Sequence, residues 1–444
     1  MNNNKLLKKN YVNNAKRKIY RRKNLQKLIY QKSIFEINSS IINSPIFYFK
    51  FICLFLIMLL LLKLLLNNNN IINKNKHINE DNITSDKWIV MIAFNSPSDS
   101  IINLEQYLNN WKIVVIGTIK TIDSNWDIFN NSNKLFYLSI KAQNKLGYNI
   151  LYYLPDDSYT RKNIGYLFAI QHGAKEIYEI EENLFISKDY LYFLDININN
   201  TYICYTMQNE QRMVNPYPHF GESNIWPRGF LIKDFTLDYN KSIYYANSAQ
   251  IKVKPLIYQG LINEIPDVDS LFLLSLGKMK KNLNITFSSN FPLLYLPGNY
   301  VPINSKNTKY LYECFPFLML PLTLNESIAD ILRGYIIERF VYGYGGSIIY
   351  FNSNAYNRDK DYNTQLFEER EILFNLHEIL EIIKSNNYLR KKPKKILFHI
   401  LSELIKLNIL KEKEKEIFQA YLKDLQNIGY IFQSKFSPLI SNNY

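Results

Sequence analysis

YTRKNIGYLFAIQHGAKEIYEIEE, residues 159–182, predicts a helix, a tight turn and a buried strand in direct succession. Asp157 or Ser158 can cap the helix, whose apolar residues recur at spacings of three and four. Gly173 is expected to end it, because glycine readily adopts the left-handed conformation common at helix C-termini. A short strand at 176–178 then leads directly into acidic residues.

Arg161 and Lys162 fall in the first turn of this predicted helix, where the helix dipole is positive and disfavours cations. A bound anion such as a diphosphate would offset that repulsion. The acidic residues Glu179, Glu181 and Glu182 follow and could hold a divalent metal against the same anion. These features favour a nucleotide-sugar site; the alternative is a surface helix with solvated charges followed by an acidic turn.

The positive charge of the chain is concentrated at its N-terminus. The 444 residues carry a formal net charge of +14, and residues 1–45 hold eleven Lys and Arg against a single acid, Glu36. The high isoelectric point therefore reflects a short tail and not a basic folded surface. We expect no nucleic-acid partner.

An apolar segment at 46–66 follows this tail. Its 21 residues match the length of about 20 that spans a bilayer, and no small-residue cleavage site follows, which predicts a retained signal-anchor. The preceding cations place the N-terminus in the cytosol. The sequence thus predicts a single-pass type II membrane protein, with 1–45 as a cytosolic tail, 67–87 as a stem and the remainder in a lumen; a buried core helix is the alternative.

Strands and helices alternate from residue 88 onward. Apolar strands are predicted at 88–94, 111–117 and 135–138, with a helix at 98–110. Strands that are apolar on both sides and separated by helices predict an α/β fold, with a mostly parallel sheet and helices on both faces. In such sheets ligands bind beyond the carboxyl ends of the strands.

The motif IPDVDS contains the candidate catalytic acids. Asp267 and Asp269 stand two apart and would point to the same side of an extended strand. That arrangement suits a general base or a clamp for an acceptor hydroxyl. The alternative is a capped turn before the apolar run 271–276.

Several other residues of the middle section have a structural interpretation as well as a functional one. His219 could be a further metal ligand, although a histidine among aromatic residues is more often structural. Asp330 and Arg333 stand three apart on a predicted helix and would form an ordinary intrahelical pair. Cys204 and Cys314 could form one disulfide.

Residues 351–444 form a predicted helical C-terminal region. Two amphipathic helices are expected there, separated by the KKPKK segment at 391–395. They are predicted to pack against the domain or a partner, and they carry no catalytic motif. Their apolar stripes are Leu373, Leu376, Ile379, Leu380 and Ile383, then Ile396, Ile400, Leu404 and Leu407.

The order of several short motifs resembles one family. After the 159–182 block come NPYPHFG, WPRG, PDVDS, VPINSKNT and a DILRGY block that leads to Gly345 and Gly346. Together they resemble the STELLO family of Golgi glycosyltransferase-like proteins over about 88–386. The resemblance implies a type II Golgi membrane protein with a glycosyltransferase-A-like domain at 88–350. Plant members of the family are associated with cellulose synthase complexes.

Taken with this resemblance, the sequence predicts transfer of a sugar from a nucleoside-diphosphate donor to a glycan or protein acceptor, with Mn²⁺ or Mg²⁺ as cofactor. The candidate metal ligands are Glu179, Glu181, Glu182 and His219. The candidate donor-binding residues are Arg161, Lys162, Asn163 and Arg228. The candidate catalytic residues are Asp267 and Asp269.

The acidic cluster departs from the family pattern. Similar proteins carry aspartates where this chain has glutamates, and the extra methylene moves each carboxylate, which Mg²⁺ in particular tolerates badly. This departure keeps open a second function. The protein would then be a non-catalytic Golgi factor that binds and assists a polysaccharide synthase, such as cellulose synthase.

Overall fold

The chain divides into two units, Met1–Glu80 and Asp81–Tyr444. The computed structural model describes residues 83–186, 213–230, 254–277, 283–357, 375–385 and 392–433 together with Met58, and gives secondary structure alone for 201–205, 243–247 and 366–374. The predicted tail, the predicted membrane segment apart from Met58, and most of the predicted stem lie outside these residues. Within the described part of the chain, no helix is long and apolar enough to span a bilayer.

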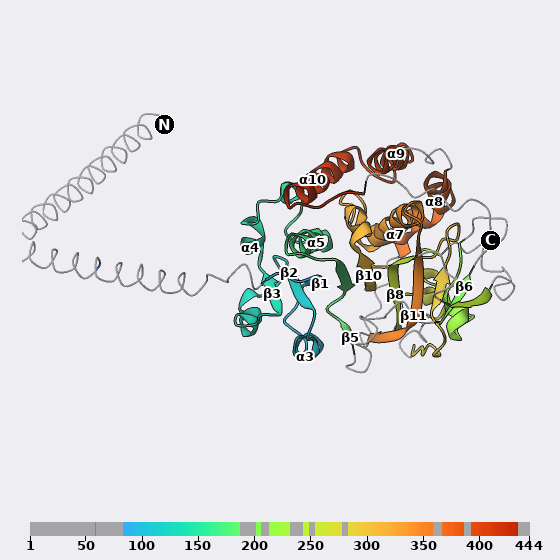
Figure 1. Ribbon diagram of the computed structural model, residues 1–444, viewed down its shortest axis with the longest axis horizontal. Coiled ribbons are helices and arrows are strands. Elements are labelled where there is room, and N and C mark those ends of the chain that lie inside the picture. The colour runs from blue at the N-terminus through green and yellow to red at the C-terminus, as the bar shows by residue number, and fades with distance from the viewer. Residues whose placement is uncertain are drawn as a thin grey trace, which may run out of the picture. The chain divides into compact units, whose positions relative to one another are not determined.

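The first half of the central sheet has the predicted alternation of strands and helices (Figure 1). Its strands lie in the order β3-β2-β1-β4, and all three pairings between them are parallel. These strands are β1 (Lys87–Ala93), β2 (Lys112–Gly117), β3 (Leu135–Leu138) and β4 (Glu176–Ile180). The predicted strands are therefore confirmed, within two residues at each end.

The second half of the sheet departs from the prediction. Here β10 (Asn307–Leu311) lies between β4 and β8 (Lys254–Glu264), antiparallel to both, and β8 pairs in parallel with β11 (Gly346–Asn357). The remaining strands are β5 (Leu184–Ile186), β6 (Thr201–Tyr205), β7 (Ile243–Asn247) and β9 (Leu293–Tyr295). The sheet is mixed and not mostly parallel, because β10 runs antiparallel to both of its neighbours and the pairs β5–β11, β9–β11 and β6–β7 are antiparallel as well. This mixed α/β architecture fits a glycosyltransferase-A-like fold.

Helices cover both faces of the first half, as predicted (Figure 1). Alternate residues of β1 face opposite sides: Ile89 packs in the same apolar cluster as α3 (Asp99–Tyr107), and Val90 in the cluster of α5 (Lys162–Gln171). A side-chain carbon at Gly165 would lie 2.6 Å from Cγ1 of Val90. Glycine at this position therefore lets α5 approach the sheet closely.

The expected signals at the two ends of the 159–172 helix are also confirmed. The Ser158 side chain accepts a hydrogen bond from the amide of Thr160, and a 3-10 turn, Tyr159–Arg161, leads into α5. Gly173 follows the helix with a φ of 92°, the left-handed conformation that glycine adopts without strain.

The described part of the C-terminal region contains three helices where two were predicted, and it is continuous with the sheet domain. The helices are α8 (Leu366–Lys384), α9 (Pro393–Lys406) and α10 (Lys413–Asn427). They lie on the same side of the sheet as α5 and α7 (Glu326–Gly343) (Figure 1). The predicted domain boundary at residue 350 falls inside β11.

Cys314 is a buried free thiol, so the disulfide with Cys204 is not formed.

Two buried carboxylates fasten α10 to the sheet domain. Asp424 accepts hydrogen bonds from the amides of Asn149 at 2.7 Å and Ile150 at 2.9 Å. Glu414 accepts from the amide of Thr323 at 2.7 Å. Each carboxylate satisfies backbone groups of a loop distant in sequence, so α10 is part of the folded core.

Replacing Asp424 with alanine is expected to lower the free energy of unfolding by about 2–3 kcal/mol, because it leaves buried amide groups without acceptors. Urea denaturation of the purified protein measures this change. Asp127→Ala is the control, because Asp127 is exposed, and surface changes stay within about 0.5 kcal/mol. Equal stability of the two variants would contradict the assigned role of Asp424.

Candidate active site

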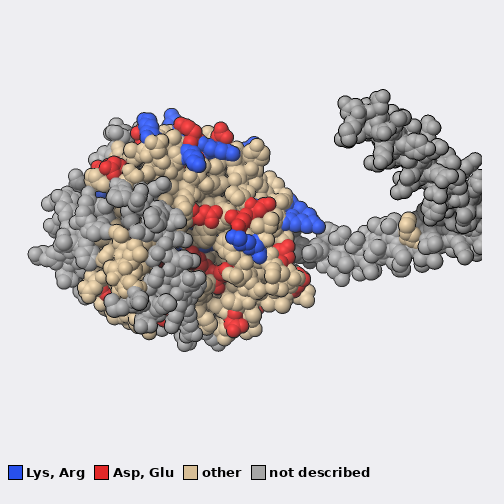
Figure 2. Space-filling model, turned by 180° about the vertical axis from the view of Figure 1, so that it is seen from behind, with Lys and Arg blue, Asp and Glu red and all other residues tan. Residues whose placement is uncertain are grey.

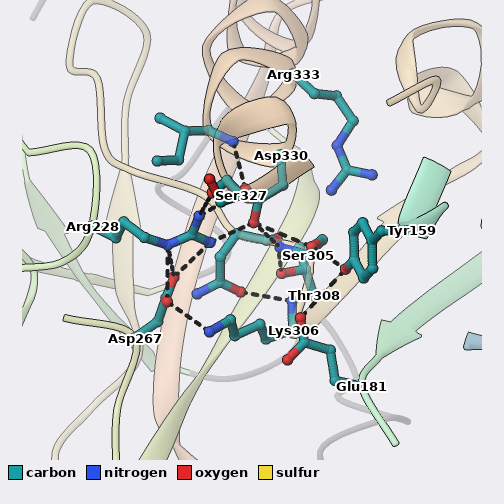
Figure 3. Close-up of polar contacts among 12 residues, drawn as sticks. Tyr159, Glu181, Arg228, Asp267, Ser305, Lys306, Thr308, Ser327, Asp330 and Arg333 are labelled. Atoms are coloured by element: carbon teal, nitrogen blue, oxygen red, sulfur yellow. Dashed lines mark hydrogen bonds and ion pairs between the residues drawn. The ribbon is translucent and has the colours of Figure 1, made fainter. Parts of the chain in front are cut away.

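The candidate site lies at one edge of the sheet, where the carboxyl ends of β4 and β8 meet the amino end of β10 (Figure 3). The antiparallel course of β10 brings its first residue, Asn307, beside Ile180 at the end of β4 and its second, Thr308, beside Gln259 of β8, which continues beyond this point to Glu264. Glu181 follows β4, Asp267 lies beyond β8, and Lys306 precedes β10. This edge is where open α/β sheets bind ligands.

Arg228 of the WPRG motif joins acidic side chains from two other parts of the chain (Figure 3). Its Nε lies 3.1 Å from Oδ1 of Asp267, and its Nη2 lies 2.6 Å from Oδ2 of Asp330. Its Nη1 donates to Asp330 as well and to the carbonyl of Ser327. Arg228 therefore holds together the loops that form the edge.

The two candidate catalytic aspartates have different surroundings. Lys306 Nζ lies 3.0 Å from Oδ1 of Asp267. Burial by itself would raise the pKa of Asp267, but the neighbouring charges of Arg228 and Lys306 hold it below its ordinary value, so Asp267 is a weak base. Asp269 instead caps α6 (Ser270–Ser275), accepting from a backbone amide of the first turn. The capped-turn alternative therefore holds for Asp269, whereas Asp267 pairs with Arg228 and Lys306.

Glu181 occupies the partly exposed side of the same edge. Tyr159 donates its hydroxyl to Oε1 of Glu181 at 3.4 Å, and the Tyr159 hydroxyl lies 2.6 Å from Oγ of Ser305. Burial is the main cause that raises the pKa of Glu181; Lys306 and Lys162 counteract it in part. Among the carboxylates described at this edge, Glu181 therefore combines access to solvent with a raised pKa.

The polar residues at the start of α5 are buried and bonded within the protein. Arg161 and Lys162 are 1% and 0% exposed. Arg161 donates to Oε1 of Gln143 at 2.8 Å, and Lys162 lies 3.2 Å from Oε1 of Glu179. The prediction of solvated charges is wrong. The repulsion from the helix dipole does not require a bound anion either, because protein groups compensate both cations.

Asn163, the third predicted donor-binding residue of this turn, is also hydrogen-bonded within the protein. Its side chain exchanges hydrogen bonds with the backbone of Leu320, as donor to the carbonyl at 3.0 Å and as acceptor from the amide at 2.8 Å. Asn163 is 0% exposed. It therefore fixes the loop before α7 against α5.

Glu179 lies deeper, on the face of β4 that packs against α5 and α7. Its Oε2 lies 2.8 Å from Nη2 of Arg333, and Tyr166 donates its hydroxyl to Oε1. The predicted intrahelical pair of Asp330 and Arg333 is wrong, because α7 presents the two residues to different partners. Both Glu179 and Arg333 are buried almost completely.

The other predicted metal ligands point elsewhere. Glu182 accepts from the amides of Phe94 at 3.0 Å and Asn95 at 3.3 Å, at the end of β1. Nε2 of His219 bonds the carbonyl of Phe291 at 2.8 Å, and burial lowers its pKa. No three His, Cys, Asp or Glu side chains in the described ranges are grouped to hold a metal. β4 ends at Ile180 and Glu182 lies in the turn that follows, so Glu182 reaches the end of β1 while Glu179 stays inside the strand beside Arg333.

Four residues of the site were not selected from the sequence: Tyr159, Ser305, Lys306 and Asp330. The motif VPINSKNT contains Ser305 and Lys306, but only the fold gives them their partners, Tyr159 and Asp267. Acidic and basic side chains lie close together near the middle of the face in Figure 2, where the described surface forms no extended basic area. That mixed surface agrees with the distribution of charge along the sequence.

No family model matches the chain. It is 30% identical over 358 residues to a protein of Arabidopsis thaliana named probable glycosyltransferase STELLO1, an alignment that covers 79% of this chain and 45% of that protein. It is 29% identical over 355 residues to probable glycosyltransferase STELLO2 of the same plant, covering 78% and 45%. The chain thus spans about half the length of the curated relatives it matches.

Proposed function

Since this chain belongs to the STELLO family, we propose that it is a glycosyltransferase that transfers a sugar from a nucleoside-diphosphate donor to a glycan or protein acceptor. One observation carries the proposal. A partly exposed carboxylate with a raised pKa, Glu181, stands near the charge of Lys306 at the candidate edge, the kind of edge at which open α/β sheets bind ligands.

Glu181 is suited to activate the acceptor. In the proposed step the acceptor hydroxyl loses its proton to the Glu181 carboxylate, its oxygen bonds to the anomeric carbon of the donor sugar, and the bond to the diphosphate breaks. A carboxylate with a raised pKa accepts a proton more readily near neutral pH. Lys306 would stabilise the negative charge that develops on the leaving diphosphate. Asp267, with its lowered pKa, holds Lys306 in place.

The proposal is tested by binding of defined donors. Isothermal titration of the purified protein with UDP-glucose, UDP-N-acetylglucosamine, GDP-mannose and GDP-fucose should give saturable binding for at least one of them. Release of free nucleoside diphosphate on addition of an acceptor glycan would then identify transfer. Absence of binding to all four sugars would count against a glycosyltransferase.

A second function is favoured by a separate observation. Glu179, Glu182 and Asp267 are all bonded to groups of the protein itself. That is expected if the site has become structural in a Golgi factor that assists a polysaccharide synthase, such as cellulose synthase. If the protein is such a factor, Glu181→Gln should co-purify with the synthase as the parent protein does. The parent protein itself should show no sugar transfer.

We further propose that the protein is a single-pass type II protein of the Golgi membrane, as its basic tail and apolar segment suggest. Protease treatment of sealed Golgi vesicles is expected to remove an epitope placed at residue 1 and to spare one at residue 444. Detergent should expose both epitopes, which is the control. The opposite pattern of protection would show the reverse orientation.

A further inference from the structure

The carboxylates of the candidate site do not fit a divalent metal. A metal of this kind needs several oxygen ligands in a defined arrangement, yet Glu179 is paired with Arg333, and Glu182 accepts backbone amides of the loop after β1. Asp267 is bonded to Arg228 and to Lys306. In the described part of the site, Glu181 differs from the other two predicted glutamate ligands: its hydrogen bond comes from the Tyr159 hydroxyl at 3.4 Å, and the charges of Lys306 and Lys162 act on it from nearby.

Lys306 places a positive charge among these carboxylates. Its ammonium lies 3.0 Å from Oδ1 of Asp267, and its side chain is 28% exposed. The ammonium of Lys306 is paired with Asp267, and its charge acts on Glu181 as well. It therefore repels a second cation at this edge.

We propose that this protein binds the diphosphate of its donor without a divalent metal, and that the ammonium of Lys306 supplies the positive charge in its place. The inference rests on the proposed function, because it concerns how the donor is held. It departs from the metal site that the family resemblance implies.

Lys306 can turn toward a diphosphate without leaving a buried charge unpaired. If its ammonium moves away, Asp267 keeps two bonds from Arg228, Nε to Oδ1 at 3.1 Å and Nη2 to Oδ2 at 3.3 Å. Arg228 in turn is fixed by Asp330. An ammonium has three donors, so Lys306 can also bond a phosphate oxygen while it retains Asp267.

The test compares donor binding with and without metal. Isothermal titration with the four nucleotide sugars named above is carried out in EDTA and in Mn²⁺, and the same dissociation constant is expected in both. Binding that requires Mn²⁺ would overturn this inference and leave the proposed function standing. Absence of binding in both buffers would overturn the proposed function and this inference with it.

Variants at Lys306 test its role directly. Lys306→Met should weaken donor binding in EDTA roughly 10- to 100-fold, the effect of losing one charged hydrogen bond, and Lys306→Arg should retain most of it. The matched control is Lys415→Met: Lys415 is 30% exposed and lies 3.1 Å from Glu412 on a different part of the molecule. If Lys306→Met folds and binds the donor like the parent protein, the inference is wrong. If Lys306→Met does not fold, Lys306→Arg serves as the test. Loss of donor binding in Lys306→Arg, with the melting temperature of the parent protein, would also overturn the inference.

Discussion

Replacing Arg333 with methionine is expected to lower the free energy of unfolding by about 3–5 kcal/mol, because it leaves a buried charge without its main partner. Glu179 is 0% exposed and lies 2.8 Å from Arg333. Arg333 also receives support from Tyr310, whose hydroxyl accepts at 3.1 Å. Lys162 remains beside Glu179 at 3.2 Å in the variant, so the loss should fall toward the lower end of this range.

The measurement is urea denaturation of the single variants Arg333→Met and Glu179→Met and of the double variant. Removing both charges together should cost less than the sum of the two single changes, because neither charge is then left unpaired. Lys406→Met is the control, since Lys406 is 70% exposed and its pair with Glu403 is a surface contact. A cost below about 1 kcal/mol for Arg333→Met, the range of surface ion pairs, would refute the assigned importance of this pair.

Glu181→Gln is expected to reduce the rate of sugar transfer by about 10²- to 10⁴-fold, the usual contribution of a general base, while the donor still binds. The sign of the pH dependence follows from the same group. A base acts when it is deprotonated, and the pKa of Glu181 is raised, so transfer should decline as the pH falls through that raised pKa. The decline should therefore begin above the pH at which an ordinary glutamate titrates.

The control for this prediction is Glu182→Gln. Glu182 is the adjacent acid, but its carboxylate accepts hydrogen bonds from the backbone amides of Phe94 and Asn95. Glutamine at this position keeps a side-chain oxygen that can accept the same hydrogen bonds. If Glu181 is the general base, the rate of transfer should fall strongly in Glu181→Gln and not in Glu182→Gln. The activity that remains in Glu181→Gln should no longer decline at low pH. Equal losses in both variants would instead point to a metal held by the two carboxylates.

Local patterns in the sequence were sufficient for the first half of the fold. The apolar runs of β1 and β2 predict buried strands, and the spacing of apolar residues in α5, with Ser158 before it and Gly173 after it, predicts that helix. These signals depend on periodicity and on backbone preferences of single residues. The order of the strands along the chain also indicated a ligand site beyond Glu179.

The second half of the sheet was not predictable in the same way. β10 looks like other short strands, and its antiparallel position between β4 and β8 depends on contacts with residues far away in sequence. The boundary at residue 350 was misplaced for the same reason, since β11 belongs to the sheet through its pairing with β8. Local periodicity identifies a strand but not its neighbour.

The local sequence already shows that acidic residues follow β4 and that basic residues begin α5, and the alternation of strands and helices predicts a candidate site at the carboxyl edge of the sheet. Which charges meet depends on the tertiary fold. Arg228 bonds Asp267, 39 residues away, and Asp330, 102 residues away, and Arg333 bonds Glu179 across 154 residues. The sequence around a charged residue does not show which distant residue it pairs with. Its partner, and with it its pKa, is set by the burial and the long-range strand register that the complete fold imposes.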